Sequence, residues 1–277
     1  MKILISADME GATGVTWPAD CEPGTEPWQR CRKMFTSDVN AAVAGFFDGG
    51  ADEVLINEAH STMRNLLLED LDQRAVMLTG RHKDLSMVEG IQHGDVDGVA
   101  FVGYHAAAGS EGVLAHTYLA NSITSVRVNG VAASEGLLNS LVAAEYGVPV
   151  ILITGDDRTC RDAAGYARTA PAVAVKDCVS RYAAVCRPPA VTAAAIREAA
   201  AHAAGLAGRT DPAATAELDI QVEVDAAQLA QAAAIVPGVR RTGDRTVEYS
   251  ATSAYEMIRS FKVVCTMISA AVEAHYG

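Results

Sequence analysis

The sequence predicts an α/β protein: a mostly parallel sheet with helices on both faces, followed by a smaller α+β unit. Three observations indicate this fold class. Short apolar runs recur in the first two thirds of the chain, segments long enough for crossover helices lie between them, and the pattern changes after residue 189. Because parallel strands need long connections, the order strand, helix, strand favours a parallel sheet.

The predicted first domain covers residues 1–189 and contains buried strands at 2–7, 53–57, 98–103 and 148–154. Residues 35–47 carry apolar side chains at helical spacing and stop at two glycines, which predicts a crossover helix. Residues 135–146 predict a second one, which ends at a Gly-Val-Pro sequence. Residues 125–131 alternate and contain Asn129-Gly130, a turn signal that predicts an antiparallel hairpin beside the sheet.

The predicted second unit covers residues 190–277 and packs on the first. An alanine-rich helix is expected at 190–207, and residues 219–224 alternate as a half-exposed strand does. The remaining predicted elements are a helix at 226–235, a short strand at 247–250 and a helix at 254–273.

Composition and charge exclude several classes of protein. Half of the 277 residues are hydrophobic and the formal net charge is −12, so the chain lacks the basic surface that nucleic-acid binding requires. No apolar run approaches the roughly 20 residues that span a bilayer, and an apolar strand at residue 2 leaves no room for a signal peptide. The six cysteines show no CxxC spacing, which favours reduced thiols over disulfides or cysteine metal sites. We therefore expect a cytoplasmic protein that binds neither nucleic acid nor membranes.

Carboxylates and imidazoles follow the predicted strands where each strand ends. Asp8 and Glu10 follow the first strand, His60 the second and His105 the third, while Glu135 begins the helix after the hairpin. Parallel α/β sheets bind ligands outside the carboxyl ends of their strands. Carboxylates gathered there repel one another unless a cation lies between them, and this mixture of donors suits zinc. An aspartate can also bridge two ions in co-catalytic sites.

Each of these residues, taken alone, has an ordinary structural alternative. Asp8 could cap a helix, Glu135 could lie in a first helical turn, and Glu10 could be exposed. His60 and His105 could be surface or hydrogen-bonded core histidines. Their joint placement at one sheet edge favours the metal site. The remaining acids and histidines that we expect to be structural or at the surface are Asp156, Asp157, His82, His93, His202 and His275.

Short motifs along the chain resemble the DppA-type zinc D-aminopeptidase family. In order, they are SADMEGATG (6–14), VLINEAHS (54–61), SMVEG (86–90), FVGYHA (101–106), GVLAHT (112–117), VNGVAASEG (128–136), YGVPVILITGDDR (146–158), and AVK with SRYAA (174–184). The C-terminal third is similar only in length and pattern. One departure is NEAH at 57–60, where the family pattern would be NDSH. Glu58 and Ala59 therefore change the groups beside His60 without removing a ligand.

The resemblance implies a dinuclear zinc site. Asp8 would bridge the two ions, Glu10 and His60 would complete one site, and His105 and Glu135 would complete the other.

The resemblance also implies an activity and an assembly. Enzymes of this family remove N-terminal D-amino acids from short peptides and form a ring-like homodecamer. His116 lies at the family position close to the metals, where it would act as catalytic base or nucleophile; we favour a proton shuttle, with a substrate-positioning role as the alternative. Selection of D over L residues depends on pocket shape, which the motifs do not encode.

Two other functions fit the same residues. A peptide-binding accessory protein without turnover could use the same fold, although five ligand-type side chains exceed what peptide binding needs. A metal-dependent phosphoesterase could use the same ions, but it would need backbone amides or basic residues for phosphate. Arg158 and Arg181 are the weak candidates for that role.

Overall fold

The computed structural model describes residues 1–214 and 216–273 and contains two sheets. The larger sheet consists, in spatial order, of β3 (Ala75–Leu78), β2 (Glu53–Glu58), β1 (Lys2–Ala7), β4 (Gly98–Val102), β7 (Val150–Asp156), β8 (Ala172–Ser180) and β9 (Ala183–Cys186). Neighbouring strands are parallel except for β9, which runs antiparallel to β8. The predicted fold class, a mostly parallel sheet with helices, is confirmed.

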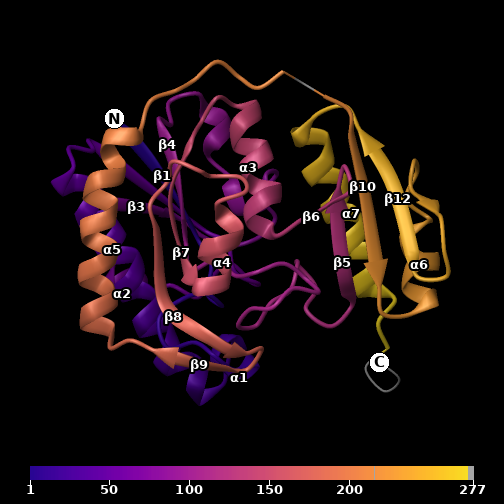
Figure 1. Cartoon of the computed structure of the whole chain (residues 1–277), viewed down its shortest axis with the longest axis horizontal. Helices are drawn as coiled ribbons and strands as arrows, with labels where there is room; N and C mark the ends of the chain where they lie inside the picture. The colour runs from indigo at the N-terminus through magenta and orange to yellow at the C-terminus, as the bar shows by residue number, and fades with distance from the viewer. Residues whose placement is uncertain (215, 274–277) are drawn as a thin grey trace.

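Helices cover both faces of the larger sheet because alternate residues of the central strand point to opposite sides. Ile3 and Ile5 pack in the same core as α2 (Glu26–Asp48) and α5 (Pro189–Ala203). Leu4 faces the other core, which contains side chains of α3 (Glu135–Glu145) and α4 (Asp157–Ala163). Figure 1 shows α2 and α5 together on one side of this sheet and α3 and α4 on the other.

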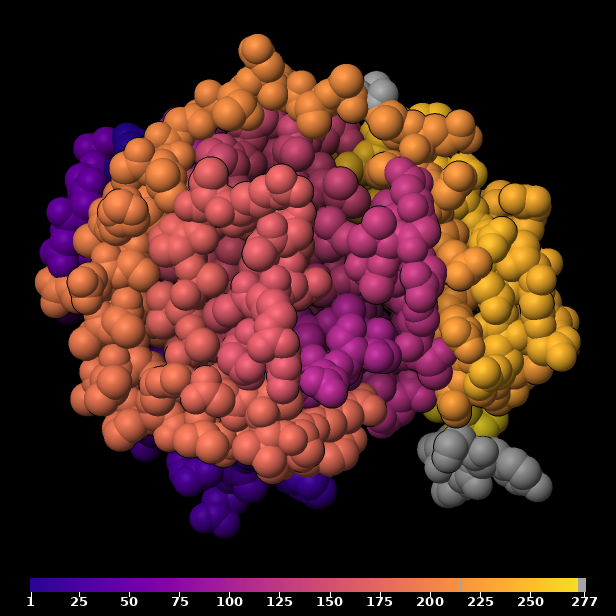
Figure 2. All heavy atoms as spheres, in the orientation of Figure 1, coloured from indigo at the N-terminus to yellow at the C-terminus, as the bar shows by residue number. Residues whose placement is uncertain are grey.

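The smaller sheet is antiparallel and combines segments from both halves of the chain. Its strands, in spatial order, are β11 (Arg240–Arg241), β12 (Thr246–Ala251), β10 (Leu218–Val224), β5 (Ile123–Val128) and β6 (Val131–Ala132). The predicted turn joins β5 to β6, with positive φ at Asn129 and Gly130 as a tight hairpin requires. In Figure 2 the magenta surface of this hairpin lies against the orange and yellow surface of β10 and β12.

Two helices pack on the smaller sheet, α6 (Ala227–Ala233) and α7 (Ala254–Ala270). The amphipathic α7 buries Met257, Ile258 and Phe261 against the sheet, and Figure 1 shows it between that sheet and α3. No helix among residues 1–214 and 216–273 is long and apolar enough to cross a membrane.

The two sheets interleave along the chain. β5 and β6 come from the first two thirds of the sequence but belong to the smaller sheet, whereas α5 packs against α2 on the larger one. The division into units at residues 1–189 and 190–277 stays a prediction.

Some element boundaries differ from the sequence-based ones. The helix expected at 35–47 begins at Glu26, because Thr25 caps it and Pro27 occupies its first turn. The helix expected at 190–207 ends at Ala203 and continues as a short 3₁₀ turn, Ala204–Leu206. β3, β8 and β9, as well as the four-residue helix α1 (Pro18–Cys21), were not predicted.

Candidate metal centre

A cavity of about 630 Å³ opens at the carboxyl ends of β1, β2 and β4. Loops after these strands form one part of its wall, and α7 forms another. The acids and histidines that line it are Asp8, Glu10, His60, His105, His116 and Glu135. All six are at most 8 % exposed. The structure thus brings together every residue of the predicted site.

Two glycines let the loops after β1 and β4 approach closely. A Cβ on Gly11 would lie 1.8 Å from the carbonyl oxygen of Tyr104, and a Cβ on Gly103 would lie 2.1 Å from that of Asp8. Gly103 also has a φ of +75°, which favours glycine. The Gly11 amide donates to the Gly103 carbonyl at 2.7 Å. This contact places Asp8 beside His105.

Asp8 lies between two histidines. Its Oδ1 is 3.5 Å from Nδ1 of His60, and its Oδ2 is 3.3 Å from Nε2 of His105. The Oδ1 also accepts the amide of Met9 at 2.9 Å, and no helix begins after Asp8. The capping alternative is therefore excluded, and the two carboxylate oxygens face opposite halves of the cluster.

The cluster has one half around His60 and one around His105, and each half contains a glutamate. Oε2 of Glu10 is 2.9 Å from Nδ1 of His60, and Oε2 of Glu135 is 3.4 Å from Nε2 of His105. Glu135 begins α3 after the cap Ser134, yet its side chain turns toward the cavity instead of serving only the helix end.

His116 faces both halves. Its Nε2 is 3.7 Å from Oε1 of Glu10 and 3.9 Å from Oε1 of Glu135. Its ring stacks on that of His105, with centroids 4.1 Å apart and planes within 7°.

Backbone carbonyls determine which nitrogen of each histidine points into the cluster. Nε2 of His60 is hydrogen-bonded to the Cys21 carbonyl at 3.1 Å, and Nδ1 of His105 is hydrogen-bonded to the Ala106 carbonyl at 3.1 Å. His116 meets the Leu114 carbonyl through Nδ1 at 2.8 Å. A carbonyl only accepts hydrogen bonds, so each of these nitrogens donates. The other nitrogen of each neutral ring then turns its lone pair toward carboxylate oxygens, which also carry lone pairs.

Such an arrangement needs positive charge between the rings and the carboxylates. Burial raises the pKa of Asp8, and Glu10 acts in the same direction. Although burial opposes it, Glu10 raises the pKa of His60 well above its ordinary value, and Glu135 does the same for His105. Protons therefore supply the charge when no metal is bound, and a metal that binds here displaces them.

The donor set fits a divalent metal. Oδ2 of Asp8 and Nε2 of His105 are buried and have no hydrogen-bond partner among the described residues. Ligand-type atoms from Asp8, His105 and Glu135 lie within 4.8 Å of one another, as do those from Glu10, His105 and His116. Carboxylate oxygen and imidazole nitrogen are common zinc ligands.

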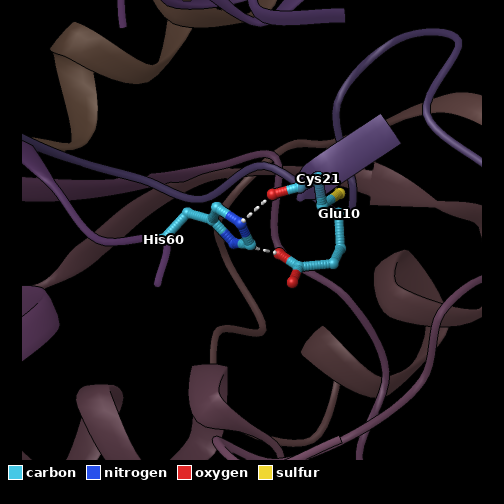
Figure 3. A group of neighbouring side chains, drawn as sticks. All are labelled: Glu10, Cys21 and His60. Atoms are coloured by element: carbon cyan, nitrogen blue, oxygen red, sulfur yellow. Dashed lines mark hydrogen bonds and ion pairs between the residues drawn. The ribbon is translucent and has the colours of Figure 1, made fainter. Parts of the chain in front are cut away.

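Cys21 lies next to the His60 half of the site and was not among the predicted residues. Figure 3 shows its carbonyl oxygen and the Glu10 carboxylate, each joined to the His60 ring by a dashed line. Its sulfur belongs to a third group of possible metal ligands, with Glu10 and His60, within 4.8 Å. The sequence contained no signal for this contact, because Cys21 lies in the unpredicted helix α1.

The departure at Glu58 has a structural explanation. Its buried carboxylate accepts the backbone and side-chain amides of Asn65 at 2.5 and 2.6 Å and the Leu66 amide at 3.2 Å. The Asn65 side chain also donates to the His60 carbonyl at 2.9 Å. Glu58 therefore orders the loop after β2 and supports the backbone, not the ring, of His60.

Lys176 holds the loop that carries Glu10. Its fully buried ammonium donates to the carbonyl oxygens of Glu10, Ala12 and Val15 at 2.6, 2.9 and 2.6 Å. This lysine lies in β8, within the AVK motif, and the motif alone did not predict this role.

Residues predicted to lie outside the site have ordinary environments. Asp156 caps α4 and also accepts the Val113 amide at 2.6 Å. Asp157 accepts the Cys178 amide at 2.7 Å. His82, His93 and His202 are exposed, although His82 lies at the cavity edge, and His275 lies outside the described residues. Neither Arg158 nor Arg181 lines the cavity.

Comparisons with known proteins agree with the geometry. Residues 1–263 match the sequence family described as D-aminopeptidase, peptidase family M55. A D-aminopeptidase of Bacillus subtilis (strain 168) is 31 % identical over 279 residues, which cover 100 % of both chains. The solved structure of the Zn-dependent D-aminopeptidase DppA from Bacillus subtilis, described as a self-compartmentalizing protease, matches with a TM-score of 0.91 and 31 % identity. That match covers 97 % of this chain and 98 % of the other. The resemblance found in the motifs is confirmed, and the chain, an enzyme of the aminopeptidase type, belongs to the D-aminopeptidase family.

Proposed function

We propose that this enzyme is a dinuclear zinc aminopeptidase that removes the N-terminal D-amino acid from short peptides. The observation that carries the proposal is the set of three histidines held by backbone carbonyls, whose free nitrogens face shared carboxylate oxygens. Structural histidines in a core do not need carboxylates on their acceptor side. The zinc dependence of the similar DppA structure supports the choice of metal.

The geometry supports a division of the ligands into two halves. Asp8 would bridge the ions, because its two oxygens face different histidines. Glu10 and His60 would complete one half, and His105 and Glu135 would complete the other.

When bound, zinc polarises a carbonyl group and lowers the pKa of water, which is the chemistry that amide hydrolysis needs. The protein's own residues supply the proton transfers. The bond from His116 Nδ1 to the Leu114 carbonyl leaves Nε2 as the atom that accepts and donates a proton. Burial lowers the pKa of His116 and keeps its ring neutral, as a base requires. The departing amine would receive that proton.

We also propose that the enzyme works as a homo-oligomer, a decamer in the cytoplasm. The similar DppA structure is described as self-compartmentalizing. The edge of the larger sheet carries exposed apolar side chains, Val179 and Tyr182 near the β8–β9 turn and Val185 on β9, and Tyr182 packs edge-on against the exposed Trp17 at 5.1 Å. An apolar patch of this kind is typical of an interface. A stable monomer in sedimentation would contradict the assembly and leave the zinc chemistry untouched.

The experiment that tests the function is cleavage of D-Ala-D-Ala and L-Ala-L-Ala, side by side, by chelator-stripped protein before and after zinc is restored. The proposal predicts zinc-dependent release of alanine from the D-peptide. Cleavage of only the L-peptide would contradict the stereochemistry. Cleavage of neither peptide by protein that holds zinc, or faster cleavage of a phosphate monoester, would contradict the substrate class.

A further inference from the structure

The cavity separates opposite charges on its walls. The acids and histidines described above lie on the loops after β1, β2 and β4 and at the start of α3. The basic residues of the cavity lie elsewhere: Arg81, His82 and Lys83 on one loop, and Lys262 on α7. Neither Lys83 nor Lys262 pairs with a carboxylate within 4.0 Å among residues 1–214 and 216–273. Lys2, by contrast, contacts two carboxylates.

Lys83 is a buried cation held only by neutral groups. It is 8 % exposed, and its ammonium donates to the Asn57 side-chain oxygen at 2.7 Å and to the carbonyls of Glu58 at 2.5 Å and Leu78 at 3.4 Å. These bonds occupy the three hydrogens of the ammonium with neutral acceptors, none of which neutralises its positive charge. An unpaired buried charge costs free energy, which an anionic ligand would recover.

Lys262 reaches the same loop from the opposite side. It donates to the carbonyl oxygens of Lys83 and Asp84, the latter at 2.9 Å. The Asp84 carboxylate does not neutralise it, because it already binds Arg259 at 3.1 Å and the Tyr255 hydroxyl at 2.9 Å. The two lysines therefore form a basic cluster, here called the lysine wall, which comprises Lys83 and Lys262.

We propose that the lysine wall binds the free C-terminal carboxylate of the substrate, with Lys262 as the hydrogen-bond donor and Lys83 adding its positive charge, so that the enzyme selects short peptides by both of their ends. This inference rests on the proposed aminopeptidase function. A short peptide is a zwitterion: its ammonium group suits the acidic side of the cavity, and its carboxylate suits the basic side. A cavity of about 630 Å³ is of the size that holds small ligands. Arg81 and His82, exposed at the rim, add positive charge that attracts such a carboxylate.

The test compares two substrates that differ by one charge, D-Ala-D-Ala and its C-terminal amide. The scissile bond and the amino terminus are the same in both. We expect the wild-type enzyme to cleave the free acid with a kcat/KM at least about tenfold higher than that of the amide, mainly through KM, since a charged hydrogen bond is lost. Equal kcat/KM values for both peptides would overturn the inference while leaving the aminopeptidase function intact. If neither peptide is cleaved, the proposed function fails and the inference fails with it.

Variants of Lys262 assign the effect to the lysine wall. Lys262→Met should abolish the preference for the acid by raising its KM toward the value for the amide, whereas Lys262→Arg should keep that preference. Lys33→Met, at an exposed position of α2 that does not line the cavity, is the control for loss of one positive charge. The zinc content of each variant is measured alongside. Equal losses for acid and amide in Lys262→Met would show a purely structural role and would overturn the assignment.

Discussion

The two parts of the cavity wall come from regions of the molecule that are built differently. The candidate metal centre lies on the loops that leave β1, β2 and β4 of the parallel sheet and at the start of α3, and buried strands lie behind its residues. The opposite wall is one face of α7, which packs on the antiparallel sheet and carries Lys262 and Thr266. The two walls therefore differ in chemistry: the sheet edge carries the candidate metal ligands, and α7 closes the opposite side of the cavity.

The largest effect is expected when a proposed metal ligand at the sheet edge is removed. His105→Ala should lower kcat/KM by at least about 1000-fold and lower the zinc content, because loss of an outer partner of a ligand alone costs about 10- to 100-fold. His202→Ala, on the exposed surface of α5, is the matched control and should change neither quantity. Full zinc content and full turnover in His105→Ala would remove this residue from the site.

The contribution of Lys176 to the loop after β1 can be tested by stability measurements, without measuring activity. Lys176→Met leaves the carbonyls of Glu10, Ala12 and Val15 without their charged donor, so the free energy of unfolding should fall by about 3 kcal/mol. Urea denaturation of metal-stripped protein measures it, and the exposed Lys33→Met serves as control. Unchanged or increased stability would show that the loop after β1 does not depend on this lysine.

The free energy of unfolding should depend on pH through Asp38, which accepts hydrogen bonds from the same loop. Burial raises the pKa of Asp38 from 3.8 to about 6, although the Thr13 amide and hydroxyl donate to it. Between these two values the folded state holds the proton and the unfolded state does not, so this group lowers the free energy of unfolding as the pH rises from 4 to 6.

Metal-stripped wild type should therefore lose about 1 kcal/mol more than Asp38→Asn between pH 5 and pH 7. Urea denaturation of both proteins at the two pH values measures this difference. Parallel stability curves for the two proteins would contradict the raised pKa.

The smallest effect on KM is expected for substitution of Thr266 on α7. The Thr266 hydroxyl already donates to the Lys262 carbonyl at 2.8 Å, so it has no proton to give to a substrate. Thr266→Val should keep the zinc content and change KM by less than about threefold. A loss of zinc, or a tenfold fall in kcat, would show that α7 takes part in the chemistry.

The residues at the sheet edge were predictable because the end of each strand is marked in the sequence by a change from apolar to polar residues. The runs Ile3-Leu4-Ile5 and Val99–Val102 are apolar, and the carboxylates and histidines follow them within a few residues. The carboxyl ends of parallel strands meet at one edge, so local order in the sequence translates directly into proximity. The hairpin turn at Asn129-Gly130 was predictable for a similarly local reason.

The buried lysines and the smaller sheet were not predictable, because they depend on contacts between segments that are far apart in the sequence. Lys83 and Lys262 are 179 residues apart, and Lys176 reaches a loop more than 160 residues before it. Nothing in the pattern around these lysines separates a buried cation from a surface one. The membership of β5 and β6 in the smaller sheet likewise appears only once β10 pairs with β5, the strand that carries β6 at its other edge.

The zinc stoichiometry of the wild type and of Asp8→Asn shows whether Asp8 bridges two metal ions. Each protein would be stripped with chelator, equilibrated with zinc, and analysed for bound metal and for alanine release from D-Ala-D-Ala. A bridging carboxylate predicts about two zinc ions per wild-type chain, and a loss of both tight binding and turnover in the variant. Two tightly bound ions and near-normal turnover in Asp8→Asn would contradict the account.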